Sequence, residues 1–203
     1  MGSQMSTLRS LAPEGGDTLS HGHAQLQHLY PFPQITMSIF ARELLPAMVI
    51  PNLGGSIWGY LLRSEFEGPL TWYERLKKPP WTPPKWVFGP VWTVLYGSMG
   101  AASWLVWRQG GGWTGAARVP LVLYATQLAL NWAWSPMFFK YHRLGLTFAT
   151  ASALWINVAA CIGCFYPINK TAAFFMVPYL GWLTLAAAVN FRLWRDNSDA
   201  DGM

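Results

Sequence analysis

The sequence predicts an all-α integral membrane protein, a bundle of five transmembrane helices. Hydrophobic residues make up 52% of the 203 residues and charged residues only 11%, whereas soluble domains average about 25% charged residues. Four apolar runs and a weaker fifth are separated by short polar turns, and a run of about 20 residues can cross about 30 Å of hydrocarbon. The 13 tryptophans are typical of a chain that meets two membrane interfaces.

Residues 1–42 form the first segment, which is polar and lacks periodicity. This composition predicts a mobile tail, without the early apolar core of a signal peptide or the Arg content of a mitochondrial presequence. The start fits the myristoylation pattern at Gly2; a native start at Met5 and chance are the alternatives. The histidines His21, His23 and His28 lack cysteine co-ligands, so we expect a solvated tail without metal.

The first predicted span, 44–62, is interrupted by Pro46, Pro51 and Asn52. We therefore expect a kinked helix, which membranes tolerate where neighbouring helices satisfy the freed carbonyls. Gly55 and Gly59 lie four residues apart and form a small-residue face that allows close contact between helices.

The stretch 72–86 carries two proline pairs, which exclude a continuous helix. Its tryptophans and tyrosine alternate with arginine and lysine, a mixture suited to the boundary between hydrocarbon and water. We interpret this stretch as a stiff lid over something held between the helices.

The remaining predicted spans are 87–107, 119–139, 144–166 and 171–194, which gives a membrane domain of 43–197 and a C-terminal tail of 198–203. An odd number of spans places the termini on opposite sides. One side receives Arg63, Arg75, Lys77, Lys78, Lys85, Lys140, Arg143, Arg192 and Arg195; the other receives Arg9, Arg42, Arg108, Arg118 and Lys170. Because cytosolic loops carry the excess of basic residues, we predict a cytosolic C-terminus.

Three of the spans have faces on which polar, aromatic and small residues gather. Positions spaced by a helical period are Trp92, Tyr96, Met99 and Ser103 in the second span, Gln127, Asn131 and Trp134 in the third, and Pro178, Trp182, Ala186 and Asn190 in the fifth. Rings beside small residues predict a slot for a flat apolar ligand. Gln127 and Asn131 either mark this site or only form hydrogen bonds between helices. The ridge Ala125, Ala129 and Ala133 suits packing against another helix.

Several function classes are disfavoured. The spans contain no Ser-His-acid grouping, no phosphate-binding glycine loop and no carboxylate pair, so we predict no catalytic residues, no required cofactor and no metal. The net charge of +5 comes mostly from loops rather than a basic stripe, which argues against nucleic acid. Cys161 and Cys164 lie in a helical run, where packing explains them better than redox chemistry or metal binding.

Five motifs then resemble the TspO/MBR family in order and spacing, over about residues 44–197. They are Trp72-Tyr73, KPPWTPPKW at 78–86, GPVW at 89–92, LNWAWSP at 130–136, and Asn190 followed by WRDN at 194–197.

The resemblance implies five transmembrane helices, commonly in a homodimer, around a pocket capped by the loop after the first helix. For the dimer, the small-residue faces are Ala125, Ala129, Ala133, Gly55 and Gly59. Family members bind protoporphyrin IX, haem and benzodiazepine-type drugs, and animal members also bind cholesterol. By position, the pocket takes in Pro84, Trp86, Trp92, Tyr96, Asn131, Trp134, Trp182 and Ala186.

The sequence departs from the family in two places. In the sterol motif, Val189, Phe191 and Arg192 have Phe where animal relatives have Tyr, and the motif itself is a weak pattern. Leu146 and Thr150 replace the Trp and Asp of vertebrate relatives, which changes the expected shape of the pocket wall.

We therefore predict a membrane receptor or transport-like protein that binds tetrapyrroles, and by resemblance sterols and benzodiazepine-type drugs. The first alternative is an enzyme that degrades porphyrin in light with the help of Trp92 and Trp182, as some bacterial relatives do. The second is a membrane scaffold with a vestigial pocket. The family's usual addresses imply the mitochondrial outer membrane or, alternatively, the endoplasmic reticulum and Golgi.

Overall fold

The computed structural model describes residues 37–66 and 71–198. The predictions for Gly2, for the three tail histidines and for most of the two tails lie outside these residues. The predicted N-terminal tail extends to residue 42, but the chain is already helical from Met37.

Within the described residues the chain is helical and contains no strand. The elements are α2 (Met37–Ile39), the π-helix η1 (Phe40–Leu44), α3 (Leu45–Leu61), α4 (Arg63–Phe66), α5 (Trp72–Arg75), α6 (Lys85–Gln109), the 3-10 helix η2 (Gly112–Thr114), α7 (Arg118–Phe139), α8 (Leu144–Phe165) and α9 (Lys170–Asp196). The five long helices coincide with the five predicted spans to within about two residues at each end.

Sequence signals explain several of the helix ends. Helix α6 begins immediately after Pro84, whose extended backbone ends the proline-rich stretch. Helix α9 begins at Asn169, whose side chain accepts a hydrogen bond from the Ala172 N–H at 2.7 Å, a standard N-cap. The prolines exclude a helix from Pro79 to Pro84 as predicted, and α4 and α5 are single turns that precede them.

Two helices of the described chain, α8 and α9, are long and apolar enough to cross a membrane by length and composition alone. Helix α3 has only 17 residues. Helices α6 and α7 are longer, but their tryptophans, glycines and polar side chains lower their hydropathy. The number of transmembrane helices therefore stays a prediction.

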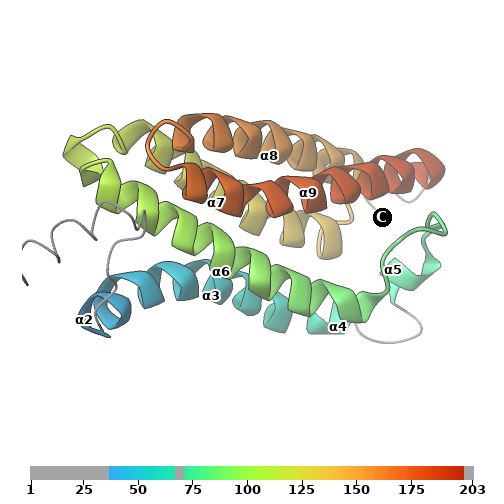
Figure 1. Cartoon of the computed structure of the whole chain (residues 1–203). Helices are drawn as coiled ribbons and strands as arrows, with labels where there is room; N and C mark the ends of the chain where they lie inside the picture. The colour runs from blue at the N-terminus through green and yellow to red at the C-terminus, as the bar shows by residue number, and fades with distance from the viewer. Residues whose placement is uncertain (1–36, 67–70, 199–203) are drawn as a thin grey trace, which may run out of the picture. The chain divides into compact units, whose positions relative to one another are not determined.

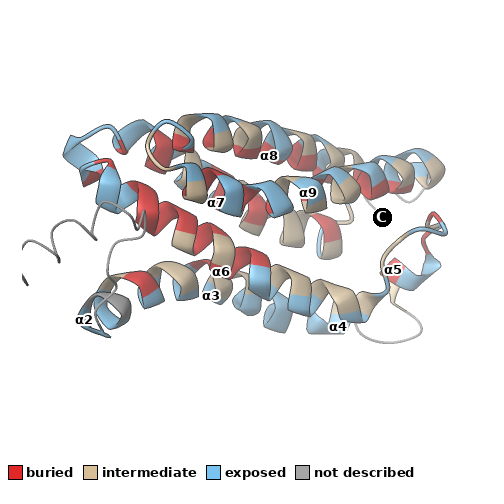
Figure 2. Ribbon diagram, viewed as in Figure 1, coloured by how far each residue is buried: buried red, intermediate tan, exposed pale blue. Residues whose placement is uncertain are grey.

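The five long helices run side by side (Figure 1), and their contacts close a ring. Around the ring, α3 contacts α6, α6 contacts α9, α9 contacts α8, α8 contacts α7, and α7 contacts α3. Figure 2 shows that α6 is buried along its C-terminal half and much less buried along the half nearest α5. The bundle is thus tightly packed at one end and looser at the end near α5.

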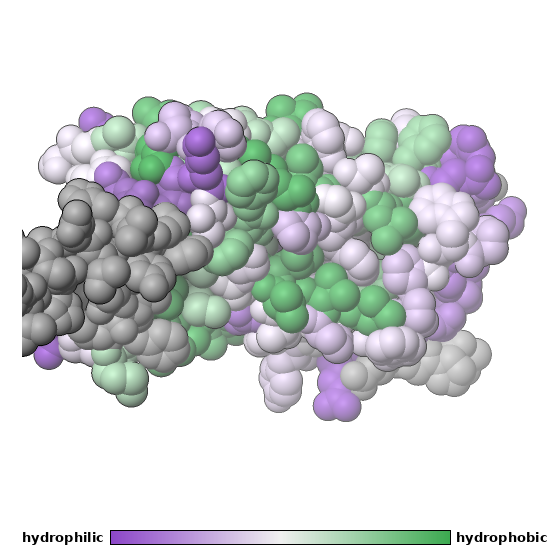
Figure 3. Space-filling model, in the orientation of Figure 1, coloured by the Kyte–Doolittle hydropathy of each residue, from purple (hydrophilic) through white to green (hydrophobic). Residues whose placement is uncertain are grey.

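Large apolar side chains cover much of the outside of the bundle, among them Ile50 and Ile57 on α3, Ile156 on α8, and Phe174 on α9. Figure 3 shows hydrophobic residues over the middle of one face, with the most hydrophilic ones toward the ends. Extensive exposed apolar surface of this kind marks contact with lipid or a partner rather than with water.

Helices α3 and α6 meet at a glycine. A Cβ atom on Gly100 would lie 2.2 Å from the Ala47 carbonyl oxygen, so only glycine permits this approach. Ala47 precedes Pro51 by one helical turn, and Pro51 has no N–H to offer that carbonyl. The carbonyl that the predicted proline interruption leaves without its usual N–H partner therefore lies against α6, inside the bundle.

Candidate functional site

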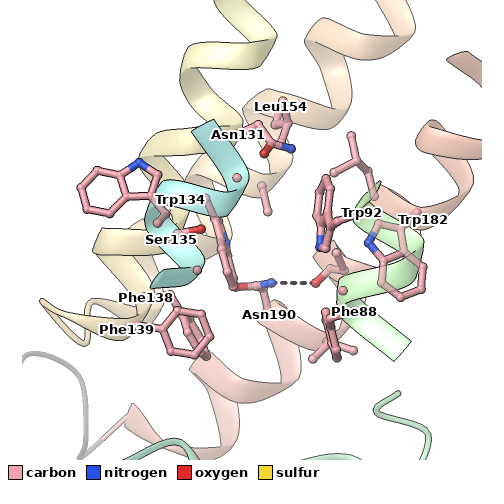
Figure 4. Close-up of a pocket in the computed structure, with 18 of the residues that line it drawn as sticks. Phe88, Trp92, Asn131, Trp134, Ser135, Phe138, Phe139, Leu154, Trp182 and Asn190 are labelled. Carbon is pink, nitrogen blue, oxygen red and sulfur yellow. Dashed lines mark hydrogen bonds between the residues drawn. The ribbon is translucent and has the colours of Figure 1, made fainter. Parts of the chain in front are cut away.

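A cavity of about 390 Å³ occupies the looser half of the bundle (Figure 4). All five long helices contribute to its wall, and Tyr73 and Pro83 contribute from the loop 71–84, which we call the lid. The wall is mostly apolar and aromatic, with few polar groups. Ligand cavities in proteins have this character and span roughly 300–1,000 Å³.

Four indole rings from four different helices line the cavity: Trp58 of α3, Trp92 of α6, Trp134 of α7 and Trp182 of α9. Figure 4 shows Trp92 and Trp182 on one side and Trp134 on the other. Trp92, Trp134 and Trp182 are each held by a second ring. Trp92 lies 5.3 Å from Tyr96, Trp134 stacks on Phe138 at 4.8 Å, and Trp182 meets Phe88 edge-on at 5.6 Å. The aromatic walls are therefore supported before any ligand arrives.

A chain of buried hydrogen bonds crosses the bundle beside the cavity. The Tyr96 hydroxyl donates to Asn131 Oδ1, and Asn131 Nδ2 donates to the Tyr179 hydroxyl at 2.8 Å. That hydroxyl in turn donates to Gln127 Oε1 at 3.1 Å. Gln127 therefore links helices and does not line the cavity, whereas Asn131 does both. The hydrogen bonds between helices are thus confirmed for both residues, whereas the role of Asn131 in a ligand site stays a prediction.

Two further polar groups lie in the cavity wall. Trp134 Nε1 donates to Asn190 Oδ1 at 3.3 Å, and Asn190 Nδ2 donates to the Ala186 carbonyl at 2.8 Å. By contrast, Trp182 Nε1 is buried without a hydrogen-bond partner among the described residues. A buried unsatisfied donor costs about 1–3 kcal/mol, and an acceptor on a bound ligand would offset this cost.

The lid is attached to the bundle by ring contacts. Trp72 stacks on His142 at 4.1 Å and meets Phe138 edge-on at 5.4 Å. Tyr73 is 6% exposed and packs against Phe138 and Phe139 at the end of α7. These contacts place Tyr73 where the cavity ends.

Polar contacts complete the attachment. The Asn197 side chain pairs with the backbone of Lys77, and Glu74 forms ion pairs with Lys78 and Lys85. Hydrogen bonds from Lys85 and then Lys78 lower the pKa of Glu74 below its ordinary value. Burial, and then the charge of Glu74, raises the pKa of Tyr73. At neutral pH the lid therefore carries an ionised Glu74 and a neutral Tyr73.

Six of the eight predicted pocket residues line the cavity: Trp92, Tyr96, Asn131, Trp134, Trp182 and Ala186. The other two do not. Pro84 faces a smaller cavity within the lid, and Trp86 is 76% exposed on the outside. Their assignment as ligand-binding residues stays a prediction.

The sterol motif is divided between the inside and the outside of the bundle. Val189 lines the cavity, whereas Phe191 lies outside against Phe148, and Arg192 pairs with Asp196. The structure thus does not bring these three residues together into one site. Leu146 and Thr150 do not line the cavity, to which α8 contributes Ala151 and Leu154; the expected change in the shape of the wall stays a prediction.

The residues of the predicted dimer faces also lie in different surroundings. Gly55 lies inside the bundle, where an added Cβ would be 2.6 Å from the Tyr96 ring, and Gly59 lines the cavity. The assignment of Gly55 to an external face is therefore wrong, because the first helix uses this glycine to pack within its own chain. Gly59 is exposed, and no atom lies within 4 Å of an added Cβ there, so its assignment stays a prediction. Ala125 and Ala129 remain exposed on the outside of α7.

Sequence reasoning missed Phe88, Phe138 and Tyr73 as parts of the cavity. Phe88 lies four residues before Trp92, and Phe138 four after Trp134, so helical spacing could have found both. For Tyr73 no comparable signal exists, because its position depends on how the lid docks.

Taken together, the fold and the cavity of the described residues define a class: a helical bundle with an apolar outer surface that encloses an aromatic-walled cavity under a basic lid. Residues 47–195 match the TspO/MBR family. The translocator protein of Ovis aries is 42% identical over 149 residues, which cover 73% of this chain and 86% of the sheep protein. The translocator protein of Homo sapiens is 42% identical over 160 residues, 77% of this chain and 93% of the human protein.

A bacterial relative is similar to a comparable degree. The tryptophan-rich sensory protein of Cereibacter sphaeroides is 40% identical over 129 residues, 64% of this chain and 78% of that protein. The chain belongs to the TspO/MBR family of membrane proteins. The resemblance found in the sequence motifs is thereby confirmed.

Proposed function

We propose that this chain is a membrane receptor or transport-like protein that holds a flat tetrapyrrole, such as protoporphyrin IX or haem, in the cavity. The observation that carries the proposal is the enclosure of about 390 Å³ by Trp92, Trp134 and Trp182. Rings of this kind favour offset or edge-on contacts with another aromatic plane. The names of the relatives, translocator protein and tryptophan-rich sensory protein, support a receptor or transport role.

The polar groups of the wall suit the edge of such a ligand. Trp182 Nε1 offers a donor, and Asn131 and Asn190 lie nearby in the same wall. The basic side chains of the lid and its end, Arg75, Lys77, Lys78 and Lys85, suit acidic substituents. Benzodiazepine-type drugs and sterols are further proposed ligands, on the family resemblance alone.

The finer architecture belongs to the same proposal. We propose five transmembrane helices, because the five long helices close one ring around the cavity. We also propose a cytosolic C-terminus, because the loops on that side carry the excess of basic residues. We also propose a homodimer through the exposed alanine ridge of α7, and a location in the mitochondrial outer membrane or, alternatively, the endoplasmic reticulum and Golgi.

The first experiment is quenching of tryptophan fluorescence by protoporphyrin IX, in detergent and in the dark. We expect saturable quenching in the wild type and weaker binding in Trp182→Ala. Trp113→Ala is the matched control, because Trp113 is 54% exposed and does not line the cavity. Absence of saturable binding in folded protein would leave the scaffold with a vestigial pocket as the better description.

A second candidate function is light-dependent degradation of the bound porphyrin. The observation that favours it is that Trp92 and Trp182 line the same cavity. If it holds, illumination in the presence of oxygen bleaches porphyrin absorbance, and Trp92→Phe or Trp182→Phe prevents the bleaching. Stable absorbance under light with intact dark binding would favour the receptor.

A further inference from the structure

The lid contains a second cavity, separate from the aromatic one. It has a volume of about 270 Å³ and is lined by Tyr73, Glu74, Lys78, Pro79, Thr82, Pro83, Pro84 and Lys85. Tyr73 and Pro83 also line the larger cavity. A molecule held among the tryptophans is therefore one side chain away from the lid cavity.

The lining of the lid cavity carries two ammonium groups and one carboxylate. Lys78 Nζ lies 3.2 Å from Glu74 Oε2, and Lys85 Nζ pairs with the other oxygen, Oε1. Both ammonium groups also lie over the ring of Tyr73, at 4.4 Å and 5.4 Å from its centroid. The ring face attracts cations without neutralising them. The lid cavity thus has an excess of positive charge beside an apolar chamber.

We infer that Lys78 and Lys85 form an anion subsite for a carboxylate carried by the ligand of the larger cavity, and that Glu74 occupies this subsite when no ligand is present. This inference rests on the proposed function and extends it in two ways. The ligand must carry a carboxylate, and Glu74 of the protein competes with that carboxylate for the two lysines.

The position of Glu74 suits an exchange of carboxylates. Glu74 lies on α5, a single turn of four residues, and its side chain is 35% exposed. Ion pairs this accessible to water contribute little to stability. A ligand carboxylate delivered through the Tyr73 and Pro83 wall can therefore displace Glu74 into water at little cost.

The other explanation of this cluster is that Glu74 only braces the lid. The two explanations predict opposite signs for one substitution. If Glu74 competes with the ligand, Glu74→Gln removes the competing carboxylate from both lysines and strengthens the binding of an acid, while Lys78 Nζ still donates to the Tyr73 carbonyl at 2.7 Å. If Glu74 is only a brace, the same substitution loosens the lid and weakens the binding of acids and neutral ligands alike.

The experiment compares protoporphyrin IX with its dimethyl ester, which has the same ring without the charges. Dissociation constants are measured in a neutral detergent free of phospholipid. We expect Lys78→Met and Lys85→Met each to weaken binding of the acid about fivefold, the effect of losing one partly exposed ion pair, and to leave the ester unchanged. Glu74→Gln is expected to strengthen binding of the acid and to leave binding of the ester unchanged.

Lys140→Met is the matched control. It removes the same charge from a lysine that lines neither cavity and lies over Tyr141 instead. The inference is overturned if acid and ester bind equally in every variant, if Glu74→Gln weakens both, or if Lys140→Met acts like the lid substitutions. It is also overturned if added anionic lipid removes the preference for the acid, because the subsite then takes a lipid phosphate. Failure of both the acid and the ester to bind would instead refute the proposed function.

Discussion

Asn197 holds the backbone of Lys77 with both ends of its side-chain amide. Its Oδ1 accepts from the Lys77 N–H at 2.8 Å, and its Nδ2 donates to the Lys77 carbonyl at 3.0 Å. The two residues are 120 positions apart. The same Nδ2 also donates to the Leu193 carbonyl at the end of α9. One side chain therefore closes the last turn of α9 and fixes the middle of the lid.

The first prediction concerns this clamp. Replacing Asn197 by Ala removes both bonds to Lys77, each of which contributes about 1 kcal/mol or less at an exposed site. We expect amide hydrogen exchange in residues 72–85 to accelerate about fivefold, without change in α7 or α8. Gln109→Ala is the control, because it removes an exposed amide bond, to Asn169, at the opposite end of the bundle. Equal acceleration throughout the chain would contradict a local clamp.

The second prediction concerns the contact between α3 and α6. Gly100→Ala puts a methyl group 2.2 Å from the Ala47 carbonyl oxygen, and a backbone atom cannot move aside as a flexible side chain can. We expect destabilisation of about 1–3 kcal/mol, seen as a lower thermal midpoint in detergent. Gly163→Ala is the control, since no atom lies within 4 Å of its added Cβ. There the better helix propensity of Ala should leave stability equal or higher.

The third prediction concerns the buried hydrogen-bond chain. Tyr179→Phe removes one hydroxyl that both accepts from Asn131 and donates to Gln127. Because both amides are left buried without this partner, we expect a loss of about 1–3 kcal/mol in the free energy of unfolding. Tyr166→Phe, at a residue 50% exposed, should be near neutral. Similar losses of unfolding free energy in the two variants would show that these buried hydrogen bonds do not hold the helices together.

The fourth prediction concerns pH. The lysine partners of Glu74 lower its pKa from its ordinary value of 4.5. Such a group stabilises the folded state above the ordinary value, and the contribution is lost as pH falls through the lowered one. We therefore expect the thermal midpoints of wild type and Glu74→Gln to differ by a constant amount between pH 5 and 8, and to converge below about pH 4.5. A difference that stays the same as the pH falls further and further below 4.5 would contradict this assignment.

The long helices could be predicted because each apolar run is bounded by charged residues, glycine or proline. The end of α6 at Gln109 and the start of α9 at Lys170 follow directly from such boundaries. Helical spacing also grouped Trp92 with Tyr96, and Trp182 with Ala186. The family motifs then placed Asn131 and Trp134 with them, and all six residues line one cavity.

The sequence by itself thus determined which residues are helical and which share a face of a helix, since both follow from local periodicity. Only the tertiary structure decided which neighbour each face meets. It placed Gly55 against Tyr96 within the chain rather than at a dimer face, and directed Trp86 outward. It also brought Asn197 to Lys77. Periodicity specifies a direction around one helix, whereas contact between distant segments depends on how all the helices pack at once.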